Sequence, residues 1–273
     1  MDSLEDFEKE EIGLIGGGFQ HAFSSTLWKK PKYIEFVKQQ YRDITFFVDW
    51  AILEHINSKG CNKKIGWVLE SRNITPGLIE AIKNNKEKIE AEYDLIITHN
   101  KELYSLGGKF VYAPPHGYWI ENPQIYSKTK LVSMISSNKS TTPGHQSRLK
   151  WVDKLKDKVD LYGFGFNEFT KKEEVLKDYM FSVTIENDNY ETYWTEKILD
   201  CFATGTVPIY YGSPDIFDHF NKDGIILLDD EFDILELSES DYEDRKEAIQ
   251  DNFQRSLKFD VIEDLIYEKW LNK

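Results

Sequence analysis

Short apolar runs, separated by turn residues and charged stretches, recur along the whole chain. Residues 77–92 show a different pattern, because Leu78, Ile82 and Ile89 share one face while Lys and Glu residues fill the other. This spacing predicts an amphipathic helix. In the first part of the chain, the apolar runs predict strands over residues 12–15, 44–48, 65–69, 93–98 and 110–113.

A second series of the same kind begins at Lys130, after the turn residues Pro114, Pro115 and Gly117. Two such series predict two Rossmann-like, doubly wound α/β domains with mostly parallel sheets. Ligands of such domains lie at the carboxyl ends of the strands, so a cleft between the domains is the expected site. The second series predicts strands over residues 131–136, 159–163, 180–185, 206–211 and 224–228, and helices over residues 146–156, 171–179, 195–204 and 214–220.

We place the two domains at residues 1–125 and 126–238. Residues 239–273 are strongly charged and predict a C-terminal helical segment that packs back on the body of the protein. A membrane-surface helix is the weaker alternative, because the polar face carries Glu and Asp as often as Lys. The apolar positions at helical spacing are Phe259, Ile262, Ile266 and Trp270.

The composition excludes several classes of protein. With 40% hydrophobic and 14% aromatic residues, the chain has too much apolar surface for intrinsic disorder. A formal net charge of -14 argues against a general nucleic-acid binder, which needs clustered Lys and Arg. Cys61 and Cys201 form no disulfide framework and favour a reducing compartment. The acidic N-terminus and the lack of a long apolar run predict a cytoplasmic protein without a membrane span, and attachment to a membrane periphery stays open.

The sequence shows no pattern of a bound metal or cofactor. The histidines lack the spacing of metal ligands, and a solvated turn explains the acidic cluster at residues 229–231. The glycine-rich segment at residues 12–23 has neither the Lys-Ser/Thr pair of a phosphate loop nor the glycine spacing of a dinucleotide site. It predicts a glycine turn after the first strand, and we expect no metal and no cofactor.

The most informative stretch is residues 181–216. Its first apolar run ends in polar residues beginning with Glu186, so these side chains emerge at the carboxyl end of a strand. Thr195 predicts the N-cap of a helix and Gly205 predicts its end. Lys197 in the first turn and the free N–H groups of the helix N-terminus could bind a phosphate together. On spacing alone, a solvated helix residue is the more frequent explanation of Lys197.

The same stretch, FSVTIENDNYETYWTEKILDCFATGTVPIYYGSPDI, resembles the donor-binding signature of the inverting α-1,3/4-fucosyltransferases. Bacterial members that modify surface glycans are especially similar through TEKILDCF and VPIYYGSP. KLVSMISSN, followed by a helix with Arg148, looks like the family's entry into its donor domain. The resemblance implies two domains facing a cleft, the arrangement called GT-B, with residues 1–125 on the acceptor side and residues 126–238 binding the donor.

The resemblance also implies a role for each matching residue. Arg148 and Lys197 would grip the pyrophosphate of GDP-fucose, and Glu196 would hydrogen-bond its ribose. A planar guanidinium can bind phosphate through two parallel N–H bonds, and an ammonium adds a point charge. Asn187 and Tyr193 would line the nucleotide and sugar pocket.

Two further acidic residues are assigned by the same resemblance. Glu186 would lie close to the fucose. In the first half, GWVLESRNITPGL resembles the family's segment in which a Trp-containing strand leads to Glu, Ser and Pro, with Arg72 where many members have that Pro. Glu70 would be the catalytic base, because a carboxylate at a strand end can take a proton from an acceptor hydroxyl. The glycine-rich segment at residues 12–23 has a secondary interpretation, in which it contacts the acceptor or the sugar.

The implied reaction is a single displacement, with inversion and without a metal, of fucose from GDP-fucose to an oligosaccharide, in α-1,3 or α-1,4 linkage to GlcNAc or Glc. The same fold with a different nucleotide-sugar donor, or a noncatalytic sugar-nucleotide or glycan-binding protein, are the alternatives. A nicotinamide-dependent oxidoreductase is a third and weaker alternative, because this chain lacks the glycine fingerprint of a dinucleotide site. A homodimer, the acceptor and the linkage position stay open.

Overall fold

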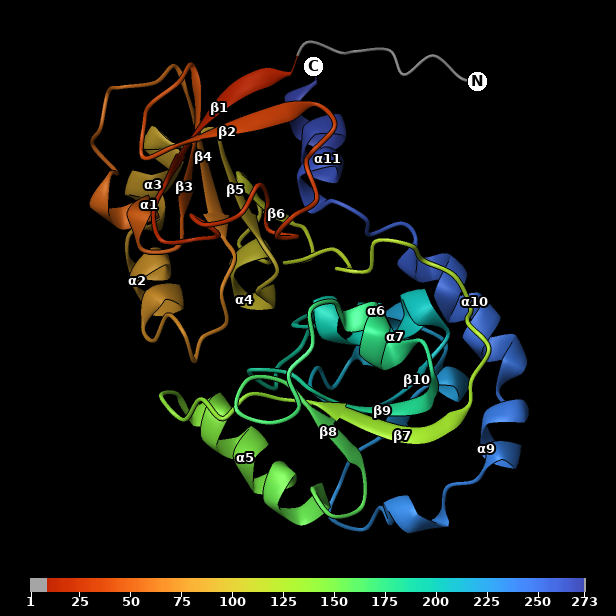
Figure 1. Ribbon diagram of the computed structural model, residues 1–273. Coiled ribbons are helices and arrows are strands. Elements are labelled where there is room, and N and C mark those ends of the chain that lie inside the picture. Colours follow the sequence, from red (N-terminus) through yellow and green to blue (C-terminus); the bar gives the residue numbers. More distant parts are fainter. Residues whose placement is uncertain (1–8, 273) are drawn as a thin grey trace, which may run out of the picture. The chain divides into compact units, whose positions relative to one another are not determined.

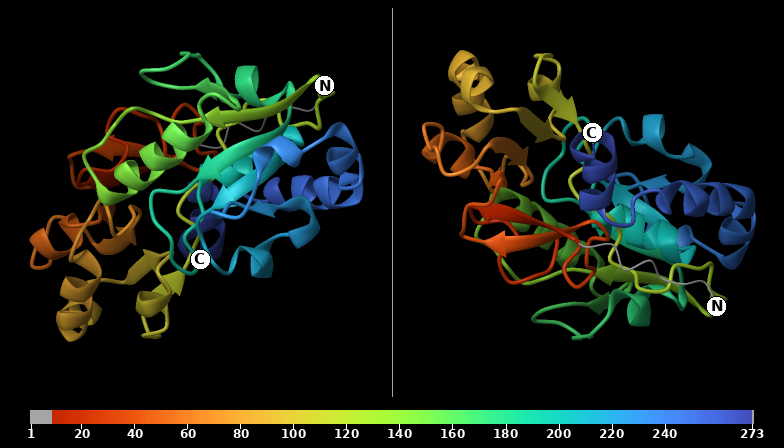
Figure 2. Two further views of the ribbon diagram at one scale, coloured as in Figure 1. Left: turned by 90° about the horizontal axis from the view of Figure 1, so that it is seen from below. Right: turned by 90° about the horizontal axis from the view of Figure 1, so that it is seen from above.

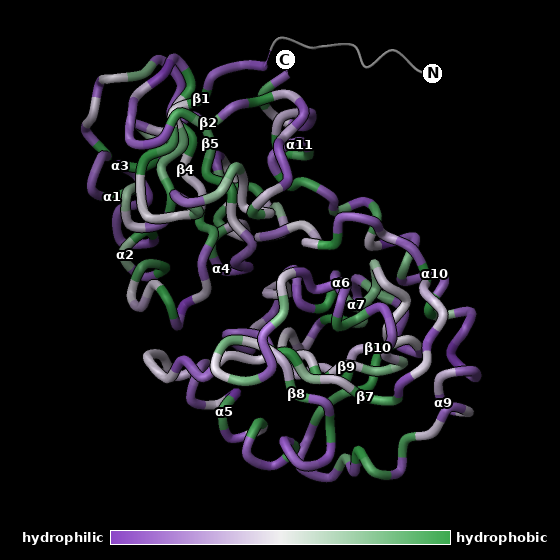
Figure 3. Tube along the Cα trace, in the orientation of Figure 1, coloured by the Kyte–Doolittle hydropathy of each residue, from purple (hydrophilic) through white to green (hydrophobic). Residues whose placement is uncertain are grey.

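The computed structural model describes residues 9–272, which form two compact units. Unit 1 contains the chain up to Gly117 and again from Val261, and unit 2 comprises Tyr118–Asp260 (Figure 1). The boundaries expected from the sequence lie at residues 125 and 238 instead. Figure 3 shows hydrophobic positions along strands of both units, as expected of sheets covered on both faces.

Unit 1 is built on a parallel sheet with the strand order β2-β1-β3-β4-β5-β6. The chain goes from β1 to the edge strand β2 and then crosses to β3, so the strand order reverses between β1 and β3. The strands expected from the apolar runs are confirmed, and β2 is an addition. The strands are β1 (Glu10–Ile15), β2 (Ile34–Lys38), β3 (Ile44–Val48), β4 (Lys63–Val68), β5 (Leu95–Thr98) and β6 (Phe110–Tyr112).

The two faces of the unit 1 sheet are covered differently. On one face, Phe47 and its neighbours pack against the helices. On the other, Phe19 from the loop after β1 packs with its ring centroid 5.4 Å from that of Phe36 and 5.8 Å from that of Trp67. The helices are α1 (Ala51–Glu54), α2 (Leu78–Asn84), α3 (Lys86–Glu92) and α4 (Lys101–Tyr104).

The single helix predicted over residues 77–92 is wrong in one respect, because the structure has two helices there. α2 ends at Asn84 and α3 begins at Lys86. Asn85 between them leaves helical geometry, with φ -112° and ψ 18°, and its side chain donates a 2.8 Å hydrogen bond to the carbonyl of Ala81. Asn competes for backbone groups in this way and therefore favours helix ends.

Unit 2 repeats the topology of unit 1, with the parallel strand order β11-β10-β9-β7-β8. The chain goes from β7 to the edge strand β8 and then crosses to β9, so the order reverses between β7 and β9. All five predicted strands are confirmed. They are β7 (Lys130–Ile135), β8 (Asp160–Tyr162), β9 (Tyr179–Ile185), β10 (Val207–Tyr211) and β11 (Ile226–Leu227).

Helices cover both faces of the unit 2 sheet (Figures 1 and 2). One face packs against Val152 of α5 and Tyr242 of α9. The other packs against Leu176 of α6, Leu199 of α7 and Ile216 of α8. This is the doubly wound arrangement that the sequence predicts. The helices are α5 (Pro143–Leu155), α6 (Lys172–Leu176), α7 (Glu196–Thr204), α8 (Ile216–His219), α9 (Glu239–Glu243) and α10 (Lys246–Ser256).

The C-terminal segment is divided between the units. Phe259 packs in unit 2 with its ring centroid 5.1 Å from that of Trp194. Val261 is extended, and α11 (Ile262–Ile266) begins after it in unit 1, where Glu263 accepts a 2.6 Å hydrogen bond from the backbone N–H of Ser25. A π-helical turn, Tyr267–Leu271, follows α11. None of the helices between residues 9 and 272 is long and apolar enough to cross a bilayer.

Candidate functional site

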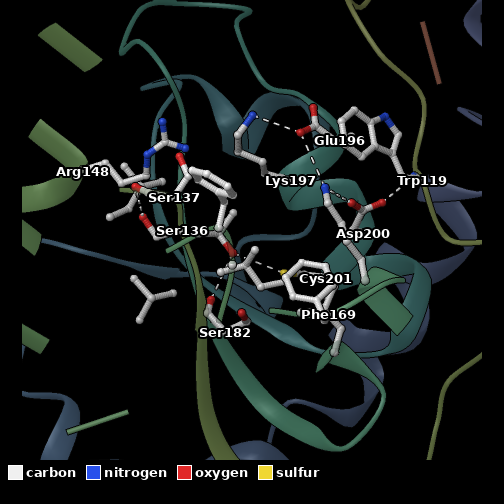
Figure 4. A pocket seen from close by; sticks show the side chains of 18 residues that line it. Trp119, Ser136, Ser137, Arg148, Phe169, Ser182, Glu196, Lys197, Asp200 and Cys201 are labelled. Carbon is white, nitrogen blue, oxygen red and sulfur yellow. Dashed lines mark hydrogen bonds and ion pairs between the residues drawn. The ribbon is translucent and has the colours of Figure 1, made fainter. Parts of the chain in front are cut away.

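A cavity of about 220 Å³ lies where the strand order of unit 2 reverses. Its walls come from the end of β7, the loop after β8, the end of β9 and the first turns of α7. Figure 4 shows Arg148, Ser136 and Ser137 on one side and Trp119, Glu196 and Asp200 on the other. Doubly wound sheets bind their ligands at this kind of position.

The N-terminus of α7 is built by Thr195 and Glu186. The Thr195 hydroxyl caps the helix, with its oxygen 3.4 Å from the N–H of Lys197. Glu186, with an exposed fraction of 2%, accepts hydrogen bonds of 2.9 Å from the Thr195 N–H and 2.6 Å from the Thr195 hydroxyl. At the other end Gly205 adopts φ 71°, the left-handed conformation that ends helices. The helix predicted over residues 195–204 is therefore confirmed.

Lys197 lines the cavity from the first turn of α7. Its ammonium lies 3.1 Å from Glu196 Oε1 and 3.5 Å from Glu186 Oε2. Burial lowers the pKa of Lys197, but the Glu196 and Glu186 carboxylates outweigh that effect and raise it above its ordinary value. Lys197 is therefore a cation, and two carboxylates share its charge.

Arg148 lines the opposite wall from α5 and is only 8% exposed. Its Nη2 donates a 3.1 Å hydrogen bond to Asn187 Oδ1, while its buried Nε has no hydrogen-bond partner. Gly144 allows this contact, because a Cβ there would lie 2.0 Å from the carbonyl oxygen of Asn187. Burial lowers the pKa of Arg148, although a guanidinium stays protonated at neutral pH. A buried N–H group without a partner is uncommon and calls for an acceptor.

The cavity also holds a second group of charged residues, which was not predicted from the sequence. Lys172 Nζ lies 2.5 Å from Asp200 Oδ2 and 4.2 Å from the centre of the Trp119 ring. The backbone N–H of Trp119 donates a 2.6 Å bond to Asp200 Oδ1. Burial raises the pKa of Asp200 to about 6, against the opposing effect of Lys172. Asp200 lies one helical turn after Glu196 on α7, so its place beside Glu196 could have been predicted from the sequence. No pattern in the sequence around Lys172 indicates that it lines the cavity.

The structure brings together only some of the residues assigned by resemblance. Arg148, Glu196 and Lys197 line the cavity. Tyr193 is buried and stacks on Tyr190, with ring centroids 5.0 Å apart. Asn187 contacts Arg148, and the buried Glu186 contacts Thr195 and Lys197. The contacts of these three residues with a sugar or nucleotide stay predictions.

Glu70 belongs to unit 1 and lies just beyond the end of β4, as predicted. It lines a separate cavity of that unit. Its backbone N–H donates a 3.2 Å bond to Oδ1 of Asp49, which also accepts a 2.9 Å bond from the N–H of Leu69. Asp49 therefore holds the turn that carries Glu70. In residues 9–272, no three His, Cys, Asp or Glu side chains are grouped to hold a metal ion.

Comparison with known proteins finds a family model that matches much of unit 2. Residues 125–240 match the family model described as glycosyltransferase family 10 (fucosyltransferase), C-terminal. The alpha-(1,3)-fucosyltransferase FucT of Helicobacter pylori is 28% identical over 145 residues, which are 46% of this chain and 30% of that protein. Human 4-galactosyl-N-acetylglucosaminide 3-alpha-L-fucosyltransferase 9 is 27% identical over 154 residues, which are 53% of this chain and 38% of that protein. These alignments thus span less than two fifths of either relative's length.

Two solved structures resemble the whole chain. A crystal structure of an alpha1,3-fucosyltransferase with GDP has a TM-score of 0.54 at 16% identity, covering 100% of this chain and 90% of the other. A second crystal structure of an alpha1,3-fucosyltransferase has a TM-score of 0.56 at 17% identity, with the same coverage. These similarities show the fold, which is of the GT-B type predicted from the sequence.

Proposed function

We propose that this chain, whose residues 125–240 match the model of the C-terminal part of glycosyltransferase family 10 (fucosyltransferase), transfers L-fucose from GDP-fucose to a hydroxyl of an acceptor glycan. The similar proteins named above are fucosyltransferases, and one of the solved structures contains GDP. The acceptor hydroxyl belongs to GlcNAc or Glc, and the transferred fucose is joined to that sugar in α-1,3 or α-1,4 linkage. The unit 1 side of the protein binds this acceptor.

One observation carries the proposal most directly: a buried arginine with an unpartnered Nε faces the same cavity as a cationic lysine and a helix N-terminus. Arg148, Lys197 and the first turn of α7 supply this set. Phosphate oxygens are acceptors that satisfy a guanidinium, an ammonium and free backbone N–H groups together. The pyrophosphate of a nucleoside diphosphate sugar therefore fits the set better than a neutral ligand does.

Donor binding would also change the partners of Lys197. Its ammonium now lies between Glu196 and Glu186. Turning toward a phosphate would leave Glu196 to accept hydrogen bonds from the paired hydroxyls of a ribose, as acidic residues do in dinucleotide sites. Glu186 would stay in place, since Thr195 holds both of its carboxylate oxygens.

The proposed reaction is a single displacement with inversion. The acceptor oxygen forms a bond to the anomeric carbon of fucose while the bond from that carbon to the β-phosphate oxygen breaks. The acceptor proton goes to the Glu70 carboxylate, and GDP leaves with the electron pair. Arg148 and Lys197 stabilise the charge that develops on GDP, so protein cations suffice and no metal is required. A β-linked donor gives an α-linked product.

We also place the protein in the cytoplasm. Both cysteines, Cys61 and Cys201, are free thiols, as is usual in a reducing compartment. Burial raises the pKa of the Cys201 thiol to about 12, which keeps it unreactive beside the cavity.

Calorimetric titration with GDP-fucose, GDP-mannose and UDP-galactose tests the donor assignment. We expect GDP-fucose to bind, UDP-galactose not to bind, and Arg148→Ala to abolish binding of GDP-fucose. Lys154→Ala is the matched control, because Lys154 lies on the same helix and pairs with the exposed Asp230 outside the cavity. Equal binding of UDP-galactose and GDP-fucose, or normal binding by Arg148→Ala, would contradict the proposal.

A further inference from the structure

A second lysine lies beside Glu196 in the unit 2 cavity. Lys172 Nζ is 3.6 Å from Glu196 Oε1, the same oxygen that lies 3.1 Å from Lys197 Nζ. The Lys172 side chain is 13% exposed and that of Glu196 is 8% exposed, so water screens the attraction between the two charges only weakly. The pyrophosphate site proposed above uses Arg148 and Lys197, and it gives no task to Lys172.

Lys172 is held in its position by Asp200 and Trp119. Its ammonium lies 2.5 Å from Asp200 Oδ2 and 4.2 Å from the centre of the Trp119 ring. The other oxygen of Asp200, Oδ1, accepts a 2.6 Å hydrogen bond from the backbone N–H of Trp119. Both oxygens of this buried carboxylate therefore have partners in the protein, so Asp200 is suited to fix Lys172 rather than to bind a ligand.

This contact joins three segments that are distant in the sequence. Lys172 is the first residue of α6, Asp200 lies one helical turn after Glu196 on α7, and Trp119 precedes β7. The residues on either side of Trp119 are buried in the same core cluster as Leu199 of α7. The packing of unit 2 therefore sets where the Lys172 ammonium lies.

The two lysines beside Glu196 would respond differently to a donor. In Figure 4, Lys197 lies on one side of Glu196, and Asp200 and Trp119 lie on the other. A pyrophosphate that attracts Lys197 would remove one cation from Glu196 and bring phosphate charge close to its carboxylate, which would repel that carboxylate. Lys172 would remain beside Glu196, because its ion pair with Asp200 needs no ligand.

We propose that Lys172, fixed by Asp200 and Trp119, is a positioning residue that keeps the Glu196 carboxylate in place for the ribose hydroxyls after Lys197 has turned to the pyrophosphate. The inference rests on the proposed function, which supplies the ribose and the pyrophosphate. Lys172 acts through Glu196 and not on the nucleotide itself. Its loss therefore weakens recognition of the ribose hydroxyls and leaves phosphate binding nearly unchanged.

A purely structural role for Lys172 predicts a different result. Burial raises the pKa of Asp200 to about 6 and Lys172 opposes that effect, so Lys172 could serve only to neutralise Asp200. The double variant Lys172→Met/Asp200→Asn removes the cation without leaving an unpaired carboxylate in the interior. The Asn oxygen can still accept the hydrogen bond from the Trp119 N–H. If Lys172 serves only Asp200, this variant binds nucleotides as the wild type does.

The first experiment compares GDP with 2′,3′-dideoxy-GDP, which keeps the base and the pyrophosphate and lacks both ribose hydroxyls. By calorimetric titration, we expect the wild type to bind GDP more tightly by about tenfold or more. Lys172→Met and the double variant should reduce this preference to about threefold or less, with the affinity for 2′,3′-dideoxy-GDP within about threefold of the wild type. The double variant decides the result if Lys172→Met alone does not fold.

Lys171→Met is the matched control. Lys171 precedes Lys172 directly, its side chain is 47% exposed and pairs with Glu121, and it lies outside the described lining of the cavity. We expect this variant to keep the preference of the wild type for GDP.

The second experiment tests whether Lys172 acts through Glu196. Glu196→Ala should itself reduce the preference for GDP, and adding Lys172→Met to it should change the preference no further, because residues that act as one unit have non-additive effects. Equal and independent effects of the two substitutions would overturn the positioning role.

The outcomes separate this inference from the proposed function. A wild type that binds GDP and 2′,3′-dideoxy-GDP equally, or a double variant that keeps the full preference for GDP, would overturn the inference while fucose transfer could still be measured. A wild type that binds neither nucleotide would contradict the proposed function, and the inference with it.

Discussion

Replacing Lys197 by methionine removes a cation and keeps the apolar stem of the side chain. In the ligand-free protein, Lys197 Nζ lies 3.1 Å from Glu196 Oε1 and 3.5 Å from Glu186 Oε2. The substitution therefore leaves two carboxylates close together, and the Glu186 side chain is fully buried. We expect both lower stability and weaker donor binding, for separate reasons.

The loss of stability follows from the buried carboxylates. Breaking a buried ion pair typically costs about 3–5 kcal/mol because one charge is left without a partner. Here the Lys197 side chain is 21% exposed, and Glu186 keeps both hydrogen bonds to Thr195. We therefore expect a loss of about 1–3 kcal/mol in the free energy of unfolding, which urea denaturation measures.

The loss of donor affinity follows from the lost phosphate contact. A hydrogen bond to a charged group contributes about 1.5–3 kcal/mol. GDP should then bind about 10- to 150-fold more weakly to Lys197→Met than to the wild type, by calorimetric titration. Lys197→Arg keeps the positive charge and should lose less, and Lys154→Met controls for removing a lysine outside the cavity. A folded Lys197→Met protein that binds GDP within twofold of the wild type would refute the reasoning.

Three further substitutions test other parts of the structure. Glu70→Gln should slow fucose transfer by about 10²–10⁴-fold with GDP-fucose affinity unchanged, measured by initial rates and calorimetry, and unchanged rates would remove Glu70 from the mechanism. Gly144→Ala places a Cβ 2.0 Å from the Asn187 carbonyl oxygen and should cost about 1–3 kcal/mol of stability in urea, with reduced GDP affinity. Burial raises the pKa of Glu263 from 4.5 to about 7, so its contribution to stability is full below pH 4.5 and is lost as the pH rises through about 7. Melting curves from pH 4.5 to 8 should show a decline for the wild type that exceeds that of Glu263→Gln by about 3 kcal/mol, and parallel curves would contradict the shift.

The sequence predicted best where local signals and burial agree. β3 is apolar at nearly every position because both of its faces are buried, and its predicted bounds are those observed. The helix α7 carried an N-cap at Thr195 and a left-handed Gly205, so both of its ends were readable. The bounds of β3 and α7 are determined by residues that are close together in the chain, so they can be predicted from the sequence.

Elements and contacts could not be predicted from the sequence where the apolar pattern is weak or where the contacting residues are far apart in the chain. β2 is a short edge strand with charged residues at Glu35 and Lys38, so its apolar run was too interrupted to be recognised. Lys172 meets Asp200 across 28 residues of sequence, and only the fold brings them together. The bonds that Glu186 makes to Thr195 depend on how the loop after β9 returns, which no local pattern shows, while the place of Glu186 near the fucose, implied by the resemblance, stays a prediction.

The most direct test of the central claim is to incubate the protein with GDP-fucose and N-acetyllactosamine and to measure both products by mass spectrometry. We expect fucosylated disaccharide and GDP in equal amounts, and neither product from Arg148→Ala. Release of GDP without fucosylated disaccharide, or transfer from another nucleotide sugar in preference to GDP-fucose, would contradict it.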